Sequence, residues 1–224
     1  HSKGYKIRGE ASTSYLYSTS AARNIFNFNP ESKILVILRN PMERAFSHYQ
    51  MAVRYGFTKL KFQEAIRKDR SKPIKGWGIS ELFIELGHYH DQLKRYFDLF
   101  PKEQIMVLLF DDLKSKPQEL MNACCHFLEI DPISLEYHKI FNSKESPKST
   151  LLNYFLTKSG LKNALKKIIS PSLKTKLSRA FYIKSTDKMK REDFEFLLDF
   201  YQDDIQKTAV LLHRNLDHWL QFKQ

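Results

Sequence analysis

Two short runs of apolar residues predict buried β-strands. Residues 34–38, Ile-Leu-Val-Ile-Leu, and residues 105–109, Ile-Met-Val-Leu-Leu, are continuous rather than alternating. Such runs are typical of strands in a parallel sheet that is covered on both faces. We therefore expect both segments to lie in one sheet, each buried on both sides.

Helical spacing dominates the rest of the chain. Apolar residues three and four positions apart predict a long helix over about 79–99, and a second helix is expected over 115–128 with Pro117 in its first turn. From about residue 151 the chain is expected to be wholly helical. The last helix carries one apolar stripe, formed by Phe194, Leu197, Leu198, Tyr201 and Ile205. Strand, helix, strand, helix in this order predicts an α/β fold, a parallel sheet flanked by helices with a helical C-terminal part.

Composition narrows the class of protein. With 224 residues, 42% of them apolar, and 7 glycines and 8 prolines, the chain is neither disordered nor collagen-like. It shows no internal repeat or linker, and no apolar run approaches the ~20 residues of a membrane span. Cys124 and Cys125 are adjacent and are expected to be buried free thiols. These features favour a soluble cytoplasmic domain, with the Golgi lumen or a membrane surface left open.

Positive charge is concentrated in one stretch. Of the net charge of +12, most falls in residues 158–191, which hold eleven Lys or Arg and one acid, Asp187. Leucines and isoleucines recur between the lysines, so the stretch can form an amphipathic element on an anionic membrane or polymer. The alternative is a solvated lysine face over an ordinary core stripe.

The junction after the first strand predicts an anion site. Asn40 is a good helix N-cap, Pro41 suits the first helical position, and Glu43 can return a hydrogen bond to the cap. The carboxyl ends of parallel strands and the N-termini of helices bind anions, and Arg39 adds a guanidinium fork. Ser47 follows Asn40 by two helical turns on the same side. The alternative is that Arg39 pairs with a carboxylate while Ser47 is simply exposed.

Several segments resemble sulfotransferases that use 3′-phosphoadenylyl sulfate. The 3′-phosphate-binding motif of that family is similar to Arg39-Asn40-Pro41-x-Glu43-Arg44-x-x-Ser47-x-Tyr49. Bacterial and heparan-sulfate-type members are similar over the segments Gly9 to Tyr17, Gly87-x-Tyr89, Phe110 to Pro117, and Asp193 to Trp219. The resemblance covers most of the chain in the right order.

The resemblance implies a fold, a reaction and a binding site. It implies the P-loop nucleotide-kinase-like sulfotransferase fold and transfer of a sulfuryl group from 3′-phosphoadenylyl sulfate to a hydroxyl or amine of a carbohydrate or other acceptor. Arg39 and Ser47 would hold the 3′-phosphate, with Glu43, Arg44 and Tyr49 structural. No metal is required by this chemistry, and His88 and His90 are badly spaced for joint ligation.

The N-terminal part departs from the family pattern. Gly4-x-x-x-x-Gly9 is followed by Glu10-Ala11, where a phosphate-binding loop would have Lys-Ser/Thr. We therefore expect residues 1–224 to form a single sulfotransferase domain without its first strand and 5′-phosphosulfate loop, and to be inactive alone. Within these residues Glu10 is the candidate catalytic base. A buried structural role for Glu10 is the alternative.

Only the positive charge of the chain restricts the identity of the acceptor. The basic stretch favours an anionic glycan or a lipid head group, with membrane-surface contact through 158–191, and nucleic acid is not expected. Trp77, in a loop between two glycines, is a candidate lid residue, with an ordinary loop aromatic as the alternative. Two other classes stay open, a non-catalytic basic module and a related α/β nucleotide kinase. The oligomeric state is not determined by the sequence.

Overall fold

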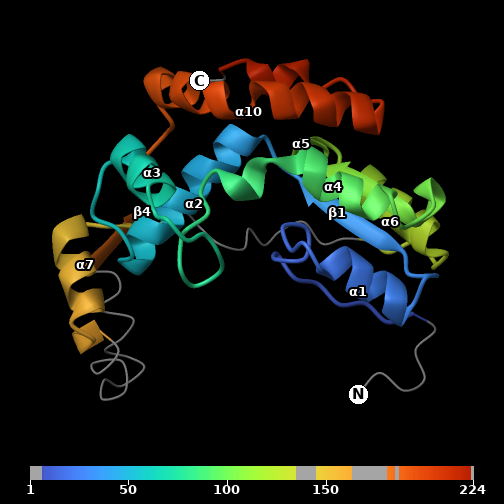
Figure 1. Cartoon of the computed structure of the whole chain (residues 1–224), viewed down its shortest axis with the longest axis horizontal. Helices are drawn as coiled ribbons and strands as arrows, with labels where there is room; N and C mark the ends of the chain where they lie inside the picture. The colour runs from blue at the N-terminus through green and yellow to red at the C-terminus, as the bar shows by residue number, and fades with distance from the viewer. Residues whose placement is uncertain (1–6, 135–144, 163–180, 185–186, 223–224) are drawn as a thin grey trace.

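The computed structural model describes residues 7–134, 145–162, 181–184 and 187–222. The chain forms an arch, with the long helix α10 along the top, α1 and β1 in one limb, and α3 and α7 in the other (Figure 1). The helices are α1 (Ala21–Phe28), α2 (Pro41–Tyr55), α3 (Phe62–Arg70), α4 (Tyr89–Phe97), α5 (Phe110–Ser115), α6 (Pro117–Leu128), α7 (Thr150–Lys158) and α10 (Arg191–Leu212). The strands are β1 (Ile34–Leu38), β2 (Ile105–Leu109), β3 (Glu145–Pro147) and β4 (Tyr182–Lys184). Short 3₁₀ turns are η1 (Glu85–Gly87), η2 (Lys102–Gln104) and η3 (Asp217–Leu220).

The two predicted strands pair in parallel. Ile34 lies opposite Ile105 in a register that continues to the ends of both strands, which confirms the predicted parallel sheet. Burial on both sides is wrong for β1, because Leu35 and Ile37 are 40% and 55% exposed. Within the described residues β1 pairs with β2 alone. Packing is therefore close only on the side of β1 that carries its buried residues.

The predicted helix over 79–99 is much shorter in the structure. Residues 79–88 form turns and η1, and α4 begins at Tyr89. The carboxylate of Asp204 accepts hydrogen bonds from the backbone N–H groups of Tyr89 at 2.7 Å and His90 at 3.2 Å. A carboxylate from α10 therefore fixes the start of α4. Leu82, inside the predicted helix, has a positive φ of 56°.

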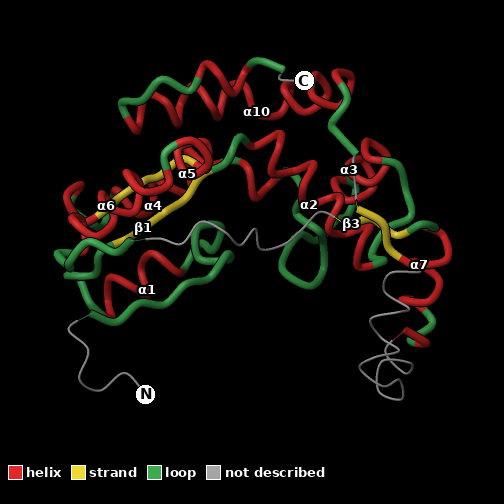
Figure 2. Tube along the Cα trace, turned by 180° about the vertical axis from the view of Figure 1, so that it is seen from behind, coloured by secondary structure: helices red, strands yellow, loops and turns green. Residues whose placement is uncertain are grey.

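The C-terminal part is not wholly helical. The predicted helix with the Phe194 stripe is confirmed as α10, but β4 pairs with β3 in an antiparallel ladder. Tyr182 of β4 donates from its hydroxyl to Asn153 Oδ1 at 3.2 Å, which ties this strand to α7. Figure 2 shows β3 beside α7 in the limb opposite α1. Most of the basic stretch 158–191 lies outside the described residues.

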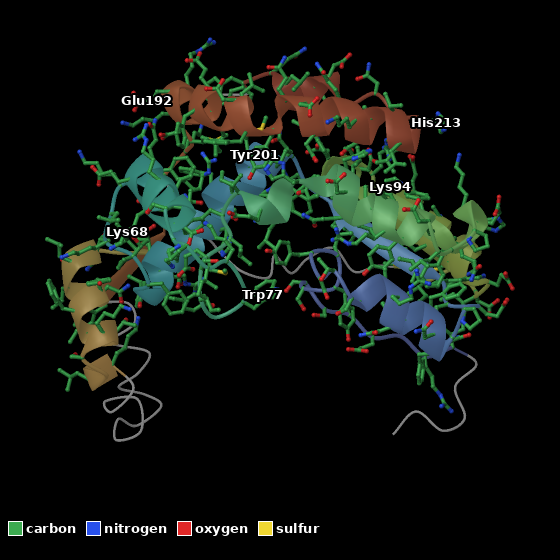
Figure 3. All side chains as sticks on the ribbon, in the orientation of Figure 1. Lys68, Trp77, Lys94, Glu192, Tyr201 and His213 are labelled. Carbon is green, nitrogen blue, oxygen red and sulfur yellow. The ribbon has the colours of Figure 1, made fainter. Side chains whose placement is uncertain are left out.

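The core lies beneath α10. Tyr201 is fully buried, and its hydroxyl donates to the backbone carbonyl oxygens of Ile84 at 3.0 Å and Phe83 at 3.3 Å. Burial raises the pKa of Tyr201, so its hydroxyl keeps its proton. Figure 3 shows Tyr201 projecting from α10 toward the elements below it. Leu216 and Trp219 are also buried and close the core at the C-terminal end.

Candidate functional site

The N-terminus of α2 is capped as the sequence predicts. Asn40 is buried, and its Oδ1 accepts hydrogen bonds from the backbone N–H groups of Met42 at 3.0 Å and Glu43 at 3.4 Å. Pro41 takes the first helical position. The helix therefore starts directly after β1, at the carboxyl end of the sheet. Its amide dipoles make this end attractive to an anion.

Glu43 does not close the predicted capping box. Its Oε2 accepts hydrogen bonds from Arg39 Nε at 3.2 Å and Nη2 at 3.1 Å. A guanidinium in this position competes better for the carboxylate than the backbone N–H of Asn40, because the pair is charged. Within the described residues, Nη1 of Arg39 has no hydrogen-bond partner. One edge of the guanidinium is thus available to a ligand.

Helix α5 supplies two residues that the sequence reasoning missed. The ring of Phe110 lies 5.3 Å from Arg39 Cζ and 4.8 Å from Lys114 Nζ. Lys114 Nζ also lies 3.7 Å from Glu43 Oε2. Two cations, Arg39 and Lys114, therefore share one aromatic ring and one carboxylate, which leaves one unbalanced positive charge among these three charged side chains. The spacing of Phe110 and Lys114, four residues apart, is the signal that could have paired them once a helix was predicted there.

The backbone beneath this cluster is held in place by distant residues. The Tyr89 hydroxyl donates to the carbonyl of Arg39 at 2.8 Å. Trp219 Nε1 donates to Asp111 Oδ2 at 3.0 Å, and His218 Nε2 lies 3.4 Å from the same oxygen. The pKa of Asp111 lies below its usual value. Partial burial by itself would raise this pKa, but the hydrogen bonds from Trp219 and His218 and the charge of Lys114 together have a larger effect in the opposite direction.

Ser47 lies on α2 beyond the cap. It is half-buried, and within the described residues its hydroxyl has no hydrogen-bond partner. The helical rise places it about 9 Å along the axis from Pro41. No direct contact joins Ser47 to Arg39, so the two side chains could meet only through a ligand between them.

Glu10 is exposed and lies in the N-terminal segment. Its carboxylate accepts a hydrogen bond from the hydroxyl of Tyr15, which raises the pKa of Tyr15. The backbone carbonyl of Tyr15 in turn accepts a hydrogen bond from Tyr96 at 2.8 Å, so the segment is tied to α4. Among the described residues, no hydrogen bond or ion pair joins Glu10 to Arg39 or Ser47.

The inner side of α2 carries two polar groups without full partners. Arg44 donates to the carbonyl of Phe83, but its Nε is buried and unpaired, as is Nδ1 of His48. The His48 ring packs edge-on against Phe83 at 4.9 Å between centroids. Burial and the nearby charge of Arg44 lower the pKa of His48 to about 4, despite an opposing effect of Asp69.

Other candidate features lie apart from this cluster. Within the described ranges there is no group of three or more His, Cys, Asp or Glu that could hold a metal ion, and no helix long and apolar enough to cross a membrane. The exposed Trp77 lies edge-on to Tyr17, with ring centroids 6.3 Å apart (Figure 3). An open depression between α4 and α10 is lined by His90, Asp203, Gln206, Lys207, Val210 and Leu211.

The chain belongs to the sulfotransferase family, and its α/β fold agrees with that assignment. The family model of the sulfotransferase domain matches residues 19–209, a range that includes nearly all of the described helices and strands. This assignment confirms the resemblance drawn from the motifs around Arg39 and the later segments.

Relatives from animals and a bacterium are similar to the chain. A bifunctional heparan sulfate N-deacetylase/N-sulfotransferase 1 from Xenopus laevis is 27% identical over 94% of this chain and 23% of that protein. The human heparan sulfate glucosamine 3-O-sulfotransferase 5 is 25% identical over 79% of this chain and 52% of that protein. The crystal structure of a sulfotransferase from Alicyclobacillus acidocaldarius superposes with a TM-score of 0.69 at 25% identity, covering 96% of this chain and 70% of that one. The chain thus spans between about a quarter and a half of these curated relatives.

Proposed function

We propose that the chain holds the 3′-phosphate of 3′-phosphoadenylyl sulfate in a sulfuryl-transfer reaction. The observation that carries this proposal is the position of Arg39, which leaves a parallel strand directly before a capped helix N-terminus. A phosphate there gains the helix dipole and a guanidinium together, while the N–H groups of Met42 and Glu43 stay bonded to the Asn40 cap.

The available donor groups suit a phosphate. Glu43 occupies the Nε–Nη2 edge of Arg39, so Nη1 can turn toward a phosphate oxygen. The Ser47 hydroxyl provides a second donor. Lys114 adds a positive charge beside Phe110, although Glu43 offsets part of it. Nucleotides that carry a 3′-phosphate should therefore bind better than those that do not.

Transfer itself needs a base and a site for the leaving group. The acceptor oxygen forms a bond to sulfur, the bond from sulfur to the bridging phosphate oxygen breaks, and adenosine 3′,5′-bisphosphate leaves. Glu10 takes the acceptor proton in this proposal. The proposal treats residues 1–224 as one sulfotransferase domain, to which a 5′-phosphosulfate loop and its strand are contributed from outside these residues.

The proposed acceptor is an anionic carbohydrate. Two of the relatives are named for heparan sulfate, a negatively charged glycan. The sequence of this chain carries a net charge of +12, which favours acceptors of opposite charge. A hydroxyl or an amine of such a glycan would supply the nucleophile.

Titration calorimetry without magnesium tests the nucleotide site. Adenosine 3′,5′-bisphosphate should bind, 5′-AMP should bind at least about tenfold more weakly, and Arg39→Ala should abolish binding. Arg23→Ala, which changes an exposed arginine on α1, is the matched control and should bind normally. Equal binding of 5′-AMP would remove the main support, and a strict need for magnesium would point to a nucleotide kinase.

A further inference from the structure

Helix α7 packs with its polar side inward. The buried Asn153 donates from Nδ2 to the carbonyls of Val53 at 2.9 Å and Arg54 at 3.1 Å. Thr157 donates from Oγ1 to the carbonyl of Tyr55 at 3.1 Å. These three carbonyls belong to the last turn of α2, where the Val53 carbonyl also accepts from the N–H of the C-cap Gly56 at 3.0 Å and the Arg54 carbonyl from the Tyr182 hydroxyl at 3.4 Å. The inward side of α7 is polar because it satisfies the end of α2.

The opposite side of α7 is apolar and faces solvent. At about 100° per residue, Leu151 and Phe155 lie about 160° from Asn153, and Leu152 lies beside them about 100° from Asn153. Their side chains are 57%, 57% and 46% exposed, in that order. A surface helix normally buries such a stripe in the core. The helix is therefore inverted with respect to the usual arrangement, and these three residues form what we call the outer face of α7.

Lysines border the outer face. Lys59 Nζ lies 5.3 Å from the ring centre of Tyr154 and 4.9 Å from that of Phe155, and Lys158 Nζ lies 5.9 Å from Tyr154. The acid Glu145 of β3 is paired with Arg54 at 2.9 Å, and the acid that interacts electrostatically with Lys158 is Glu81. Positive charge is thus held beside exposed hydrocarbon at one end of the arch (Figure 1).

We propose that the outer face of α7 docks on an anionic lipid surface. Leu151, Leu152 and Phe155 would enter the boundary between head groups and acyl chains, while Lys59 and Lys158 would contact the phosphates. The sequence continues with the same character, since residues 158–191 hold eleven Lys or Arg and one acid. This proposal does not depend on sulfuryl transfer.

Charge argues for lipid over the other possible occupants. A two-fold dimer through this face would bring Lys59 and Lys158 toward the same residues of the second copy. Residues 163–180, which are not described, contain five Lys or Arg and no acid, so covering the face with them would add like charge. A sulfated glycan would satisfy the lysines but leave Leu151 and Phe155 in water.

Vesicle co-sedimentation of the full chain tests the proposal. The chain should bind vesicles of equal parts phosphatidylcholine and phosphatidylserine, bind phosphatidylcholine alone weakly, and lose affinity as salt is raised. The double variant Leu151→Ser, Phe155→Ser should bind at least about tenfold more weakly. Lys59→Glu should also bind the phosphatidylserine-containing vesicles about tenfold more weakly.

Matched controls come from the other limb of the arch. Phe28→Ser removes an apolar side chain of α1 that is 91% exposed, and Lys102→Glu reverses an exposed charge before β2. Both variants should bind like the unaltered chain. Circular dichroism of every variant should match as well, because each substituted side chain is solvent-exposed or borders solvent.

A shift in tryptophan emission distinguishes a lipid surface from the other possible occupants of the outer face. The chain already contains the exposed Trp77 and the buried Trp219, so the measurement is the emission of each variant minus that of the unaltered chain. This difference should lie at long wavelength for Phe155→Trp alone and shift to shorter wavelength with anionic vesicles, while the difference for Phe28→Trp should not shift. A short-wavelength difference for Phe155→Trp without vesicles would overturn the proposal in favour of coverage by the chain itself or a second copy, which light scattering would tell apart. Equal binding by the double variant, or none by the unaltered chain, would also overturn it.

Discussion

Asn40 and Trp219 are joined by a hydrogen bond although they are 179 residues apart in the sequence. Asn40 Nδ2 donates to the Trp219 carbonyl at 3.2 Å, while its Oδ1 caps α2. Trp219 also donates from Nε1 to Asp111 in the first turn of α5, which directly follows β2. One amide side chain therefore couples the start of α2, where the proposed phosphate site lies, to the C-terminal turn.

Replacing Asn40 should lower the free energy of unfolding. Asn40→Ala removes the cap and the bond to Trp219, so we expect a loss of about 2 kcal/mol in urea denaturation. Asn40→Asp keeps an acceptor for the cap but places a carboxylate against the Trp219 carbonyl, so a loss of about 1 kcal/mol is expected. Asn24→Ala, on exposed α1, is the control. If Asn40→Asp is as stable as the unaltered chain, the link to Trp219 contributes nothing.

Glu43→Gln should strengthen binding of adenosine 3′,5′-bisphosphate. The amide oxygen can still accept from Arg39, but the negative charge 3.1 Å from Nη2 is gone. Because that charge repels a phosphate at the same guanidinium, we expect affinity to rise about fivefold in calorimetry at low salt. Glu31→Gln, an exposed glutamate, should have no effect. Weaker binding by Glu43→Gln would mean that orientation of Arg39 matters more than charge.

Gly87→Ala should destabilise the core beneath α10. An added Cβ would lie 2.8 Å from Cε1 and the hydroxyl of Tyr201, atoms that are buried and hydrogen-bonded. Tyr201 would have to move away from the carbonyl of Ile84, so we expect a loss of about 2 kcal/mol in thermal or urea unfolding. Gly9→Ala has nothing within 4 Å and is the matched control. An unchanged midpoint for Gly87→Ala would show that Tyr201 shifts without cost.

Local patterns predicted the elements whose causes are local. The runs at 34–38 and 105–109 became paired strands, and the Asn40 cap and Pro117 start were found where expected. Helix α4 was predicted too early because its start depends on Asp204, which is 115 residues away from Tyr89 in the sequence. No spacing within 79–99 could reveal that contact.

The candidate site was also predicted only in part, because local sequence patterns do not reveal contacts between distant elements. Arg39 and Ser47 were singled out by their spacing around the cap, and their binding roles stay predictions. The pairing of Arg39 with Glu43, weighed as an alternative from the sequence, is present. Phe110 and Lys114 were missed because α5 has only six residues, too few for a helical period to be recognised.

Glu10→Gln should slow sulfuryl transfer without weakening nucleotide binding. A glutamine cannot take the acceptor proton, so a base at this position predicts a loss of about a hundredfold or more in the rate of transfer. The measurement is transfer of labelled sulfate by a preparation that is active with 3′-phosphoadenylyl sulfate. Tyr15→Phe removes the hydrogen bond to Glu10 and should have a smaller effect. Full activity of Glu10→Gln would assign Glu10 a structural role and leave the base elsewhere.

His48 should make the folded chain sensitive to mild acid. Burial beside Phe83 and the charge of Arg44 lower its pKa to about 4 in the folded state, against 6.5 for an ordinary histidine. Between these two pKa values the histidine is protonated in the unfolded chain but not in the folded chain. The free energy of unfolding is therefore highest above about pH 6.5 and falls as the pH drops toward about 4, by up to about 3 kcal/mol. Urea denaturation at roughly pH 7 and pH 5 measures this loss, which should be smaller in His48→Gln and unchanged in His126→Gln, where the histidine is exposed. Identical losses in the unaltered chain and His48→Gln would assign the acid sensitivity to carboxylates.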